Sequence, residues 1–171
     1  MCIWSNFYQD RVNTNYQEYF EKKYNILLQM LHGCKSVREE GIGIGSVSKY
    51  LIKQGVKTSG FDLCPDMLEL CRLNNPTINC WVGDIFTQQS ESVDMVVTHG
   101  VLEHFSDVGI KKILNRYKWE KQSSVHYVPL NGYDKPSFGD ERLLSWEHWV
   151  YKFNPTRYVV VDKKDLYLYF S

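Results

Sequence analysis

Three glycines at alternating positions constrain the fold of this chain more than any other feature of its sequence. Gly41, Gly43 and Gly45 follow the short predicted strand Ser36–Glu40 and precede a predicted helix that ends at Gly55. Glycines let the backbone turn tightly and let a ligand lie against the main chain beside a helix N-terminus. The spacing is GxGxG, whereas the dinucleotide fingerprint is GxGxxG. Alone the turn is a weak signal, because many α/β domains contain glycine-rich turns.

Strand and helix patterns alternate along most of the chain. Further predicted strands cover Lys57–Leu63, Thr77–Val82, Val93–Thr98 and Ser123–Leu130. Predicted helices cover Asn13–Leu31, the segment that begins at Pro65, and Asp107–Lys118. Strands that alternate with helices imply a parallel sheet with both faces covered.

The C-terminal part departs from this alternation. Residues 131–154 begin with turn residues and continue into a short predicted helix, Ser145–Tyr151. Two β-rich runs, Tyr158–Val161 and Leu166–Phe170, then flank a polar turn as an antiparallel pair does. We therefore predict an α/β fold with a doubly wound Rossmann-like sheet, mostly parallel, with an antiparallel C-terminal edge hairpin and helices on both faces.

Length, charge and cysteine usage limit the function classes. The 171 residues suit one domain, 1–171, and the 20 basic residues balance the 20 acidic ones. Because no basic excess or cluster marks a nucleic-acid surface, a nucleic-acid partner is disfavoured. No signal-peptide pattern and no apolar run of about 20 residues is present, so no membrane partner is expected. The five cysteines lack CxxC or zinc-ligand spacing, and we expect reduced thiols, no metal site and a cytoplasmic protein.

Acidic residues stand at the ends of the predicted strands, where ligands bind in such sheets. Glu39, two positions before the first glycine, suits a ligand with an ammonium group better than a pyrophosphate. Asp62 can accept two hydrogen bonds from a ribose diol, or it only caps the helix that begins at Pro65. Asp84 and Ile85 can hold an adenine, with the carboxylate on the exocyclic amine and the apolar side chain against the ring.

Four segments in this order resemble the class I S-adenosylmethionine-dependent methyltransferases, particularly the small-molecule branch that includes ubiquinone and menaquinone biosynthesis enzymes. They are Glu39–Gly45, Asp62–Met67, Gly83–Ile85 and Gly100–His104. The resemblance implies S-adenosylmethionine as cofactor and S-adenosylhomocysteine as product. The cofactor-binding residues it implies are Glu39, Gly41, Gly43, Gly45, Asp62, Leu63, Met67, Gly83, Asp84, Ile85, His99 and His104.

One strand departs from the pattern of that family. The family's first strand is usually apolar, whereas here it reads Ser-Val-Arg-Glu-Glu. Arg38 and Glu40 share one face of this central strand. They therefore need to pair with each other or with neighbouring groups.

The resemblance also implies transfer of the sulfonium methyl group to a small-molecule acceptor by in-line displacement. That reaction needs alignment and a dry pocket more than a fixed catalytic residue. His99, Glu103 and His104 are candidates for a general base, or they contact cofactor or cap the following helix. Candidate substrate-binding residues come from an N-terminal lid or packing segment, 1–33, and from the candidate substrate-side segment 131–154. They are Tyr16, Tyr133, Arg142 and Trp146, each of which a packing role explains equally well.

Two other interpretations remain open from the sequence. A non-catalytic cofactor-binding or partner-binding module of the same fold agrees with the short chain and the lack of an obvious base. A nicotinamide-dependent oxidoreductase is supported only by the general fold and is disfavoured by the GxGxG spacing. The Asp/Asn-Pro-Pro-aromatic motif of amino-directed nucleic-acid methyltransferases is absent, because its place holds Thr98-His99-Gly100. A small molecule is therefore the favoured acceptor.

Overall fold

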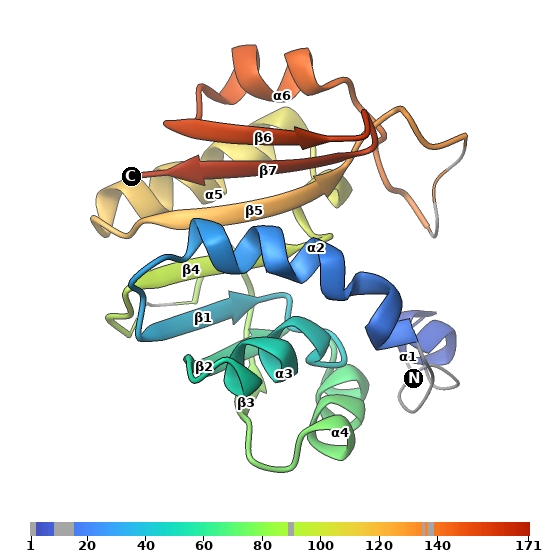
Figure 1. Ribbon diagram of the computed structural model, residues 1–171, viewed down its shortest axis with the longest axis vertical. Helices are drawn as coiled ribbons and strands as arrows, with labels where there is room; N and C mark the ends of the chain where they lie inside the picture. Colours follow the sequence, from blue (N-terminus) through green and yellow to red (C-terminus); the bar gives the residue numbers. More distant parts are fainter. Residues whose placement is uncertain (1–2, 9–15, 89–90, 135, 137–138) are drawn as a thin grey trace. The chain divides into compact units, whose positions relative to one another are not determined.

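The computed structural model describes residues 3–8, 16–88, 91–134, 136 and 139–171, without the side chains of residues 3 and 16–22. The chain divides into two compact units, Met1–Val97 and Thr98–Ser171 (Figure 1). The prediction that residues 1–171 act as one domain stays a prediction.

Parallel strands form the centre of the first unit. They are β1 (Ser36–Glu40), β2 (Lys57–Asp62), β3 (Asn79–Val82) and the start of β4 (Met95–His99). β1 pairs in parallel with both β2 and β4, and β2 pairs in parallel with β3. The register places Glu39 beside Gly60 and Asp62 beside Val82. The carboxyl ends of these strands therefore meet at one edge of the sheet.

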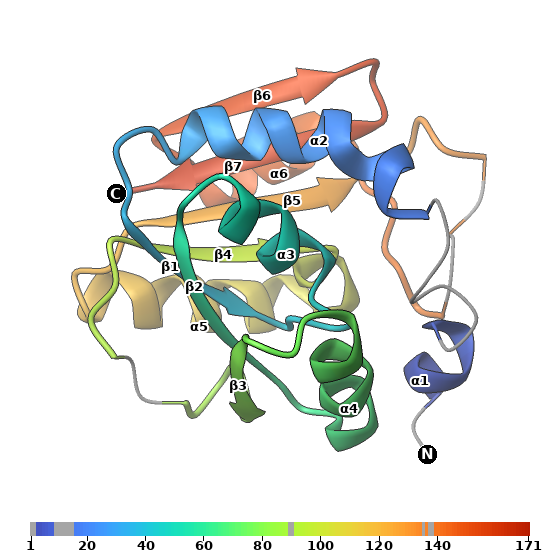
Figure 2. The same ribbon diagram turned by 60° about the horizontal axis from the view of Figure 1, so that its bottom comes forward.

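The helices of the first unit are α1 (Ile3–Tyr8), α2 (Tyr16–Met30), α3 (Ser46–Lys53) and α4 (Pro65–Asn74). Figure 2 shows α3 and α4 beside the strands, and α4 contacts both β2 and β3. Pro65 opens α4, where the missing N–H of a proline costs no helical hydrogen bond. Leu68 and Cys71 then pack with Ile42 of the glycine turn in a core cluster that also includes Ile78 and Cys80.

The second unit contains η2 (Leu102–His104), α5 (Asp107–Trp119), β5 (Ser124–Pro129), α6 (Trp146–Phe153), β6 (Arg157–Val161) and β7 (Asp165–Phe170). Ser106 and Ser145 cap α5 and α6 by accepting hydrogen bonds from backbone N–H groups of the first turn. β7 lies between β5 and β6 and runs antiparallel to both (Figure 1). The predicted antiparallel C-terminal hairpin is confirmed.

The strands are hydrogen bonded in the order β3-β2-β1-β4-β5-β7-β6. This seven-stranded, mostly parallel sheet with packed helices confirms the predicted α/β fold class. β1 has the bounds that the sequence predicted, whereas β3 begins at Asn79 instead of Thr77. In the described residues, no helix is both long enough and apolar enough to cross a membrane.

The two charged residues of β1 pair with each other. Arg38 and Glu40 are both fully buried, and the guanidinium donates from Nη2 and Nε to Oε1 of Glu40 over 3.0 and 3.2 Å. A third hydrogen bond runs from Arg38 Nη1 to the carbonyl oxygen of Glu91, at 2.7 Å. The pairing that the sequence required therefore exists. It satisfies a central strand whose buried face would otherwise carry two uncompensated charges.

The cysteines differ from expectation at one position. Cys34, Cys71 and Cys80 are free thiols, as predicted. Cys64 is disulfide-bonded, so the prediction that all five cysteines are reduced is wrong for this residue. The cysteine spacing alone did not indicate this bond, because cysteines distant in sequence can meet in the fold.

Breaking the buried pair should be strongly destabilising. We expect Glu40→Leu to reduce the free energy of unfolding by about 3–5 kcal/mol, because it leaves the Arg38 charge buried without its partner. The double variant Arg38→Met/Glu40→Leu should recover most of that loss, since both charges are removed together. Urea unfolding measures both values, and Lys57→Gln, at an exposed residue of β2, is the control. A Glu40→Leu variant as stable as the wild type would contradict this account.

Candidate functional site

The glycine turn adopts a backbone conformation that requires glycine. Gly41, Gly43 and Gly45 all have positive φ angles, of 74°, 55° and 72°. At Gly45 an added Cβ would lie 2.6 Å from Sγ of Cys71 in α4, which is too close for any side chain. Two backbone N–H groups, of Gly41 and Ile42, also donate to the carbonyl oxygen of Phe61 at the end of β2. The turn is therefore fixed against both α4 and β2.

Glu39, the last-but-one residue of β1, points into the start of α3. One of its carboxylate oxygens accepts hydrogen bonds from the backbone N–H of Ser48, at 3.0 Å, and from the Ser48 hydroxyl, at 2.5 Å. Burial raises the pKa of Glu39 to about 8, although the Ser48 hydrogen bonds act in the opposite direction. The nearby Asp62 carboxylate raises it further. A cation that binds beside Glu39 would compensate this charge.

Asp62 connects the second strand with the glycine turn. Its Oδ2 accepts a hydrogen bond from the backbone N–H of Gly43 at 2.9 Å, and its Oδ1 accepts one from the N–H of Cys64, also at 2.9 Å. Burial raises its pKa, and these backbone hydrogen bonds oppose the shift. Asp62 therefore does more than cap α4. Each carboxylate oxygen has a second lone pair, so both remain able to accept a ligand hydroxyl.

Asp84 and Ile85 lie in the turn that follows the end of β3 at Val82. Asp84 Oδ1 accepts a hydrogen bond from the backbone N–H of Phe86, at 2.8 Å, which orders the turn. Ile85 is buried beside it. At Gly83 an added Cβ would approach Gln88 Oε1 to 2.7 Å and the Phe61 ring to 3.0 Å. Glycine is therefore needed there for close packing.

Leu63 and Met67 are the two predicted cofactor-binding residues on either side of Pro65, and their side chains differ in solvent exposure. Met67 is 3% exposed and packs with Ile44 of the glycine turn, with Trp4 and Tyr8 of α1 against them. Its terminal methyl would lie 3.5 Å from a Cβ at Gly43. Leu63, by contrast, is 70% exposed. Met67 is thus part of the support beneath the turn, whereas Leu63 presents an apolar side chain to any ligand that covers the strand end.

The predicted residues near β4 belong to the second unit. The His99 ring stacks on Tyr127, with centroids 4.0 Å apart. Glu103 is buried, and His104 Nδ1 lies 2.8 Å from Asp140 Oδ1. The structure thus brings Glu103 and His104 together on η2, and His99 precedes them at the end of β4.

The candidate substrate residues make contacts within their own unit. The hydroxyl of Tyr133 donates to Asp165, and the Trp146 ring stacks on Tyr158. Arg142 donates to Asp107 over 2.7 Å and to the carbonyl oxygen of Phe105. These contacts agree with the packing alternative for these residues but do not exclude substrate contact. Tyr16 begins α2, and its side chain lies outside the described residues.

Sequence reasoning missed two groups of functional interest. Ser48 holds Glu39, and its position in the first turn after the glycines is a signal that the sequence offered. Asp140 lies beside His104, and the grouping of Glu141 with Glu103 and His104 was also missed, because no spacing rule connects residues so far apart in the chain. The prediction of no metal site considered cysteine and histidine spacing and so did not consider this second group.

Comparison with known proteins indicates a methyltransferase fold. Residues 39–115, just under half of the chain, match the family model described as a methyltransferase domain. No curated protein sequence is significantly similar to the chain. Among solved structures, the PH0226 protein from Pyrococcus horikoshii OT3 superimposes with a TM-score of 0.78 and 15% identity. The match covers 97% of this chain and 98% of that one.

Two larger proteins share the same fold. Human N-acetylserotonin methyltransferase, in complex with S-adenosylmethionine, matches with a TM-score of 0.72 and 14% identity over 98% of this chain. A putative O-methyltransferase from Nostoc punctiforme matches with a TM-score of 0.70 and 11% identity over 97% of this chain. The chain spans only 56% and 59% of these two proteins. At these identities the likeness shows the fold, and the matched family segment contains the glycine turn, Asp62, Asp84 and Glu103.

Titration of Glu39 should appear in the pH dependence of stability. Its pKa is about 8 in the fold against an ordinary value of 4.5, so its protonated form stabilises the fold. That contribution is complete below about pH 4.5 and is lost as the pH rises towards 8. Between pH 5 and 8 we expect the wild type to lose stability relative to Glu39→Gln, by at most about 1.4 kcal/mol per pH unit.

Urea unfolding at several pH values measures this difference. Glu69→Gln, at an exposed position of α4, should show the wild-type pH dependence. Parallel curves for wild type and Glu39→Gln would contradict the raised pKa.

Proposed function

We propose that the chain is an S-adenosylmethionine-dependent methyltransferase that acts on a small-molecule acceptor. The observation that carries the proposal is the pair of strand-end carboxylates on either side of the glycine turn, the buried Glu39 and the half-buried Asp62. Both are already oriented by backbone N–H groups. The match of residues 39–115 to a methyltransferase domain supports the activity and the cofactor.

The electrostatics of this pair favour a cationic ligand. Burial raises the pKa of Glu39 and of Asp62, and Asp62 raises that of Glu39 further. A pyrophosphate would add negative charge to this cluster, whereas the ammonium and sulfonium groups of S-adenosylmethionine offset it. The same argument disfavours a nicotinamide dinucleotide, in agreement with the GxGxG spacing.

Each strand end has a distinct part in binding. Glu39 faces the amino-acid part of the cofactor and attracts its ammonium group. Asp62 accepts hydrogen bonds from the two ribose hydroxyls with the lone pairs that Gly43 and Cys64 do not use. Asp84 accepts from the adenine amine while Ile85 contacts the ring. These roles follow the order of the strands, β1 to β3, along one edge of the sheet.

The reaction joins an acceptor lone pair to the methyl carbon as the carbon–sulfur bond breaks. The sulfonium becomes the neutral thioether of S-adenosylhomocysteine, and the acceptor loses a proton to a base or to water. Proximity and alignment supply most of the rate enhancement in such a displacement. His99, Glu103 and His104 are the titratable side chains that we propose as candidates to receive the proton.

Direct binding and product formation test the proposal. Isothermal titration should show binding of both S-adenosylmethionine and S-adenosylhomocysteine to the wild-type protein. Mass spectrometry should then detect a product heavier by one methyl group among a panel of hydroxylated and amino metabolites. Absence of binding by both compounds at millimolar concentration would refute the proposal.

A non-catalytic cofactor-binding module is the second candidate. It is favoured by the contacts of Tyr133, Arg142 and Trp146, because packing within the second unit explains each of these candidate acceptor-binding side chains. This alternative predicts cofactor binding without any methylated product. One methylated metabolite formed by the wild-type protein would exclude it.

The Asp62→Ala variant tests the ribose contact. We expect it to weaken S-adenosylmethionine binding by about 1–3 kcal/mol, because two hydrogen bonds to a charged acceptor are lost. Glu69→Ala removes an exposed carboxylate from the adjacent helix α4 and should leave the affinity unchanged. Titration calorimetry gives the dissociation constant of S-adenosylmethionine for each variant, and circular dichroism checks that each variant is folded. Wild-type affinity in folded Asp62→Ala would return Asp62 to a purely structural role.

A further inference from the structure

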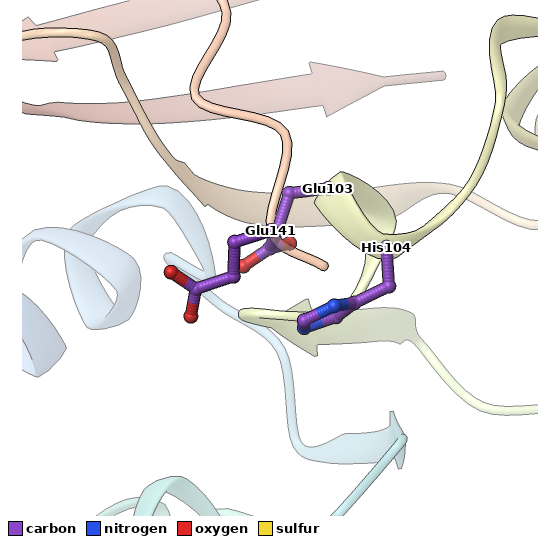
Figure 3. A group of neighbouring side chains, drawn as sticks. All are labelled: Glu103, His104 and Glu141. Carbon is purple, nitrogen blue, oxygen red and sulfur yellow. The ribbon is translucent and has the colours of Figure 1, made fainter. Parts of the chain in front are cut away.

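Three potential metal ligands meet in the second unit. Glu103 and His104 project from η2, and Glu141 comes from the segment that precedes α6 (Figure 3). One ligand atom from each side chain lies within 4.8 Å of the other two. Ligands on opposite sides of an ion at about 2.2 Å are about 4.4 Å apart, so only small side-chain movements would close the group around an ion.

The backbone holds this group together. The N–H of Arg142 donates to the carbonyl oxygen of Glu103 at 3.0 Å, which fixes Glu141 beside η2. The Arg142 guanidinium binds Asp107 and the carbonyl oxygen of Phe105. The Arg142 side chain therefore tethers this segment to Asp107 and Phe105, while its backbone N–H tethers it to the backbone of Glu103.

Glu103 is the central observation. Its side chain is 1% exposed, and its Oε2 has no hydrogen-bond partner in the described part of the chain. The carboxyl groups of Glu141 and Asp140 lie nearby. An unsatisfied buried carboxylate next to two other acids is costly. A divalent cation would compensate the charge and fill the unused coordination position.

The histidine is oriented as metal-ligating histidines commonly are. His104 Nδ1 lies 2.8 Å from Asp140 Oδ1. A carboxylate in this position fixes the ring and increases the basicity of the other nitrogen, Nε2, by which the ring would coordinate. Asp140 itself is largely exposed.

We propose that Glu103, His104 and Glu141 form a binding site for a divalent metal ion. Two carboxylates and one imidazole suit a cation of intermediate hardness, and Mn²⁺ is the probe we choose. The charges of the two ligand carboxylates equal that of the ion, so the charge of the buried Glu103 is compensated on binding. Water would complete the coordination sphere.

The site would also bear on the acceptor, a step that rests on the proposed methyltransferase function. A metal ion lowers the pKa of a bound hydroxyl group and holds its oxygen in place. An acceptor that binds the ion through a hydroxyl would therefore lose its proton to water more readily. The chemical class favoured is a hydroxyl-bearing small molecule with a second oxygen donor for the metal.

Electron paramagnetic resonance tests the site directly, without cofactor or acceptor. Titration of the full chain with Mn²⁺ should remove one equivalent of the free-ion signal. Glu141→Gln should weaken binding by about tenfold or more, because a charged ligand is lost. Glu147→Gln, at an exposed glutamate of α6, should bind as the wild type does. Absence of binding to the wild type at millimolar Mn²⁺, or equal binding by Glu141→Gln, would overturn the proposal.

The Glu103→Gln variant separates a metal ligand from a protonated structural glutamate. We expect the metal-free variant to be at least as stable as the wild type, because glutamine cannot ionise in this buried position, and we expect it to lose the increase in melting temperature that Mn²⁺ gives the wild type. A Mn²⁺-induced increase that survives in folded Glu103→Gln would contradict the assignment.

Failure of this proposal is distinguishable from failure of the proposed function. Binding of S-adenosylmethionine in the presence of a chelator, without Mn²⁺ binding, would reject the metal site alone. Binding of Mn²⁺ with no binding of S-adenosylmethionine or its product would support the metal site and reject the methyltransferase assignment.

Discussion

The Asp62 carboxylate is the contact on which the candidate cofactor site depends. It accepts the N–H of Gly43 on one oxygen and the N–H of Cys64 on the other, so it fixes the glycine turn relative to the start of α4. A glycine-rich loop has high conformational entropy, and without such contacts its ordering would have to be supplied by the ligand. A loop that is ordered before binding leaves more of the interaction energy for affinity. The same carboxylate thus prepares the site and contributes acceptors to it.

In the described residues, three carboxyl groups that we propose as functional share the lack of a cationic partner. Glu39 and Glu103 are buried and Asp62 is half-buried, and burial is the largest cause of the raised pKa of each. Arg38 and Glu40 show how this fold treats a buried carboxylate with a structural role, which is to pair it directly with a guanidinium. In the described residues, Glu39 accepts its hydrogen bonds from Ser48, and Glu103 Oε2 accepts none. Charges left in this state are poor contributors to stability and suitable contributors to cation binding.

The sequence predicted the fold well because its signals were local. The glycine turn, Pro65 at the start of a helix and the β-rich C-terminal runs each specify backbone geometry within a few residues. The ends of β1 to β3 followed from these elements, since parallel strands place their carboxyl ends at one edge. The environment of Glu103 was not predictable in this way. It depends on a hydrogen bond between the backbones of residues 103 and 142, and on the conformation of an irregular segment, neither of which a periodic pattern encodes.

The charged strand β1 shows why a departure from a family pattern need not mean a different function. Arg38 and Glu40 lie on one face of the strand, and Glu39 lies on the other, so the pair satisfies itself without involving the residue that faces α3. Side chains of a β-strand alternate between its two faces, so the charged pair and the residue that faces α3 occupy opposite sides of β1. One face carries the buried Arg38–Glu40 ion pair, and the opposite face places Glu39 at the first turn of α3. The unusual composition of this strand therefore changes how the core is stabilised and leaves the geometry of the glycine turn intact.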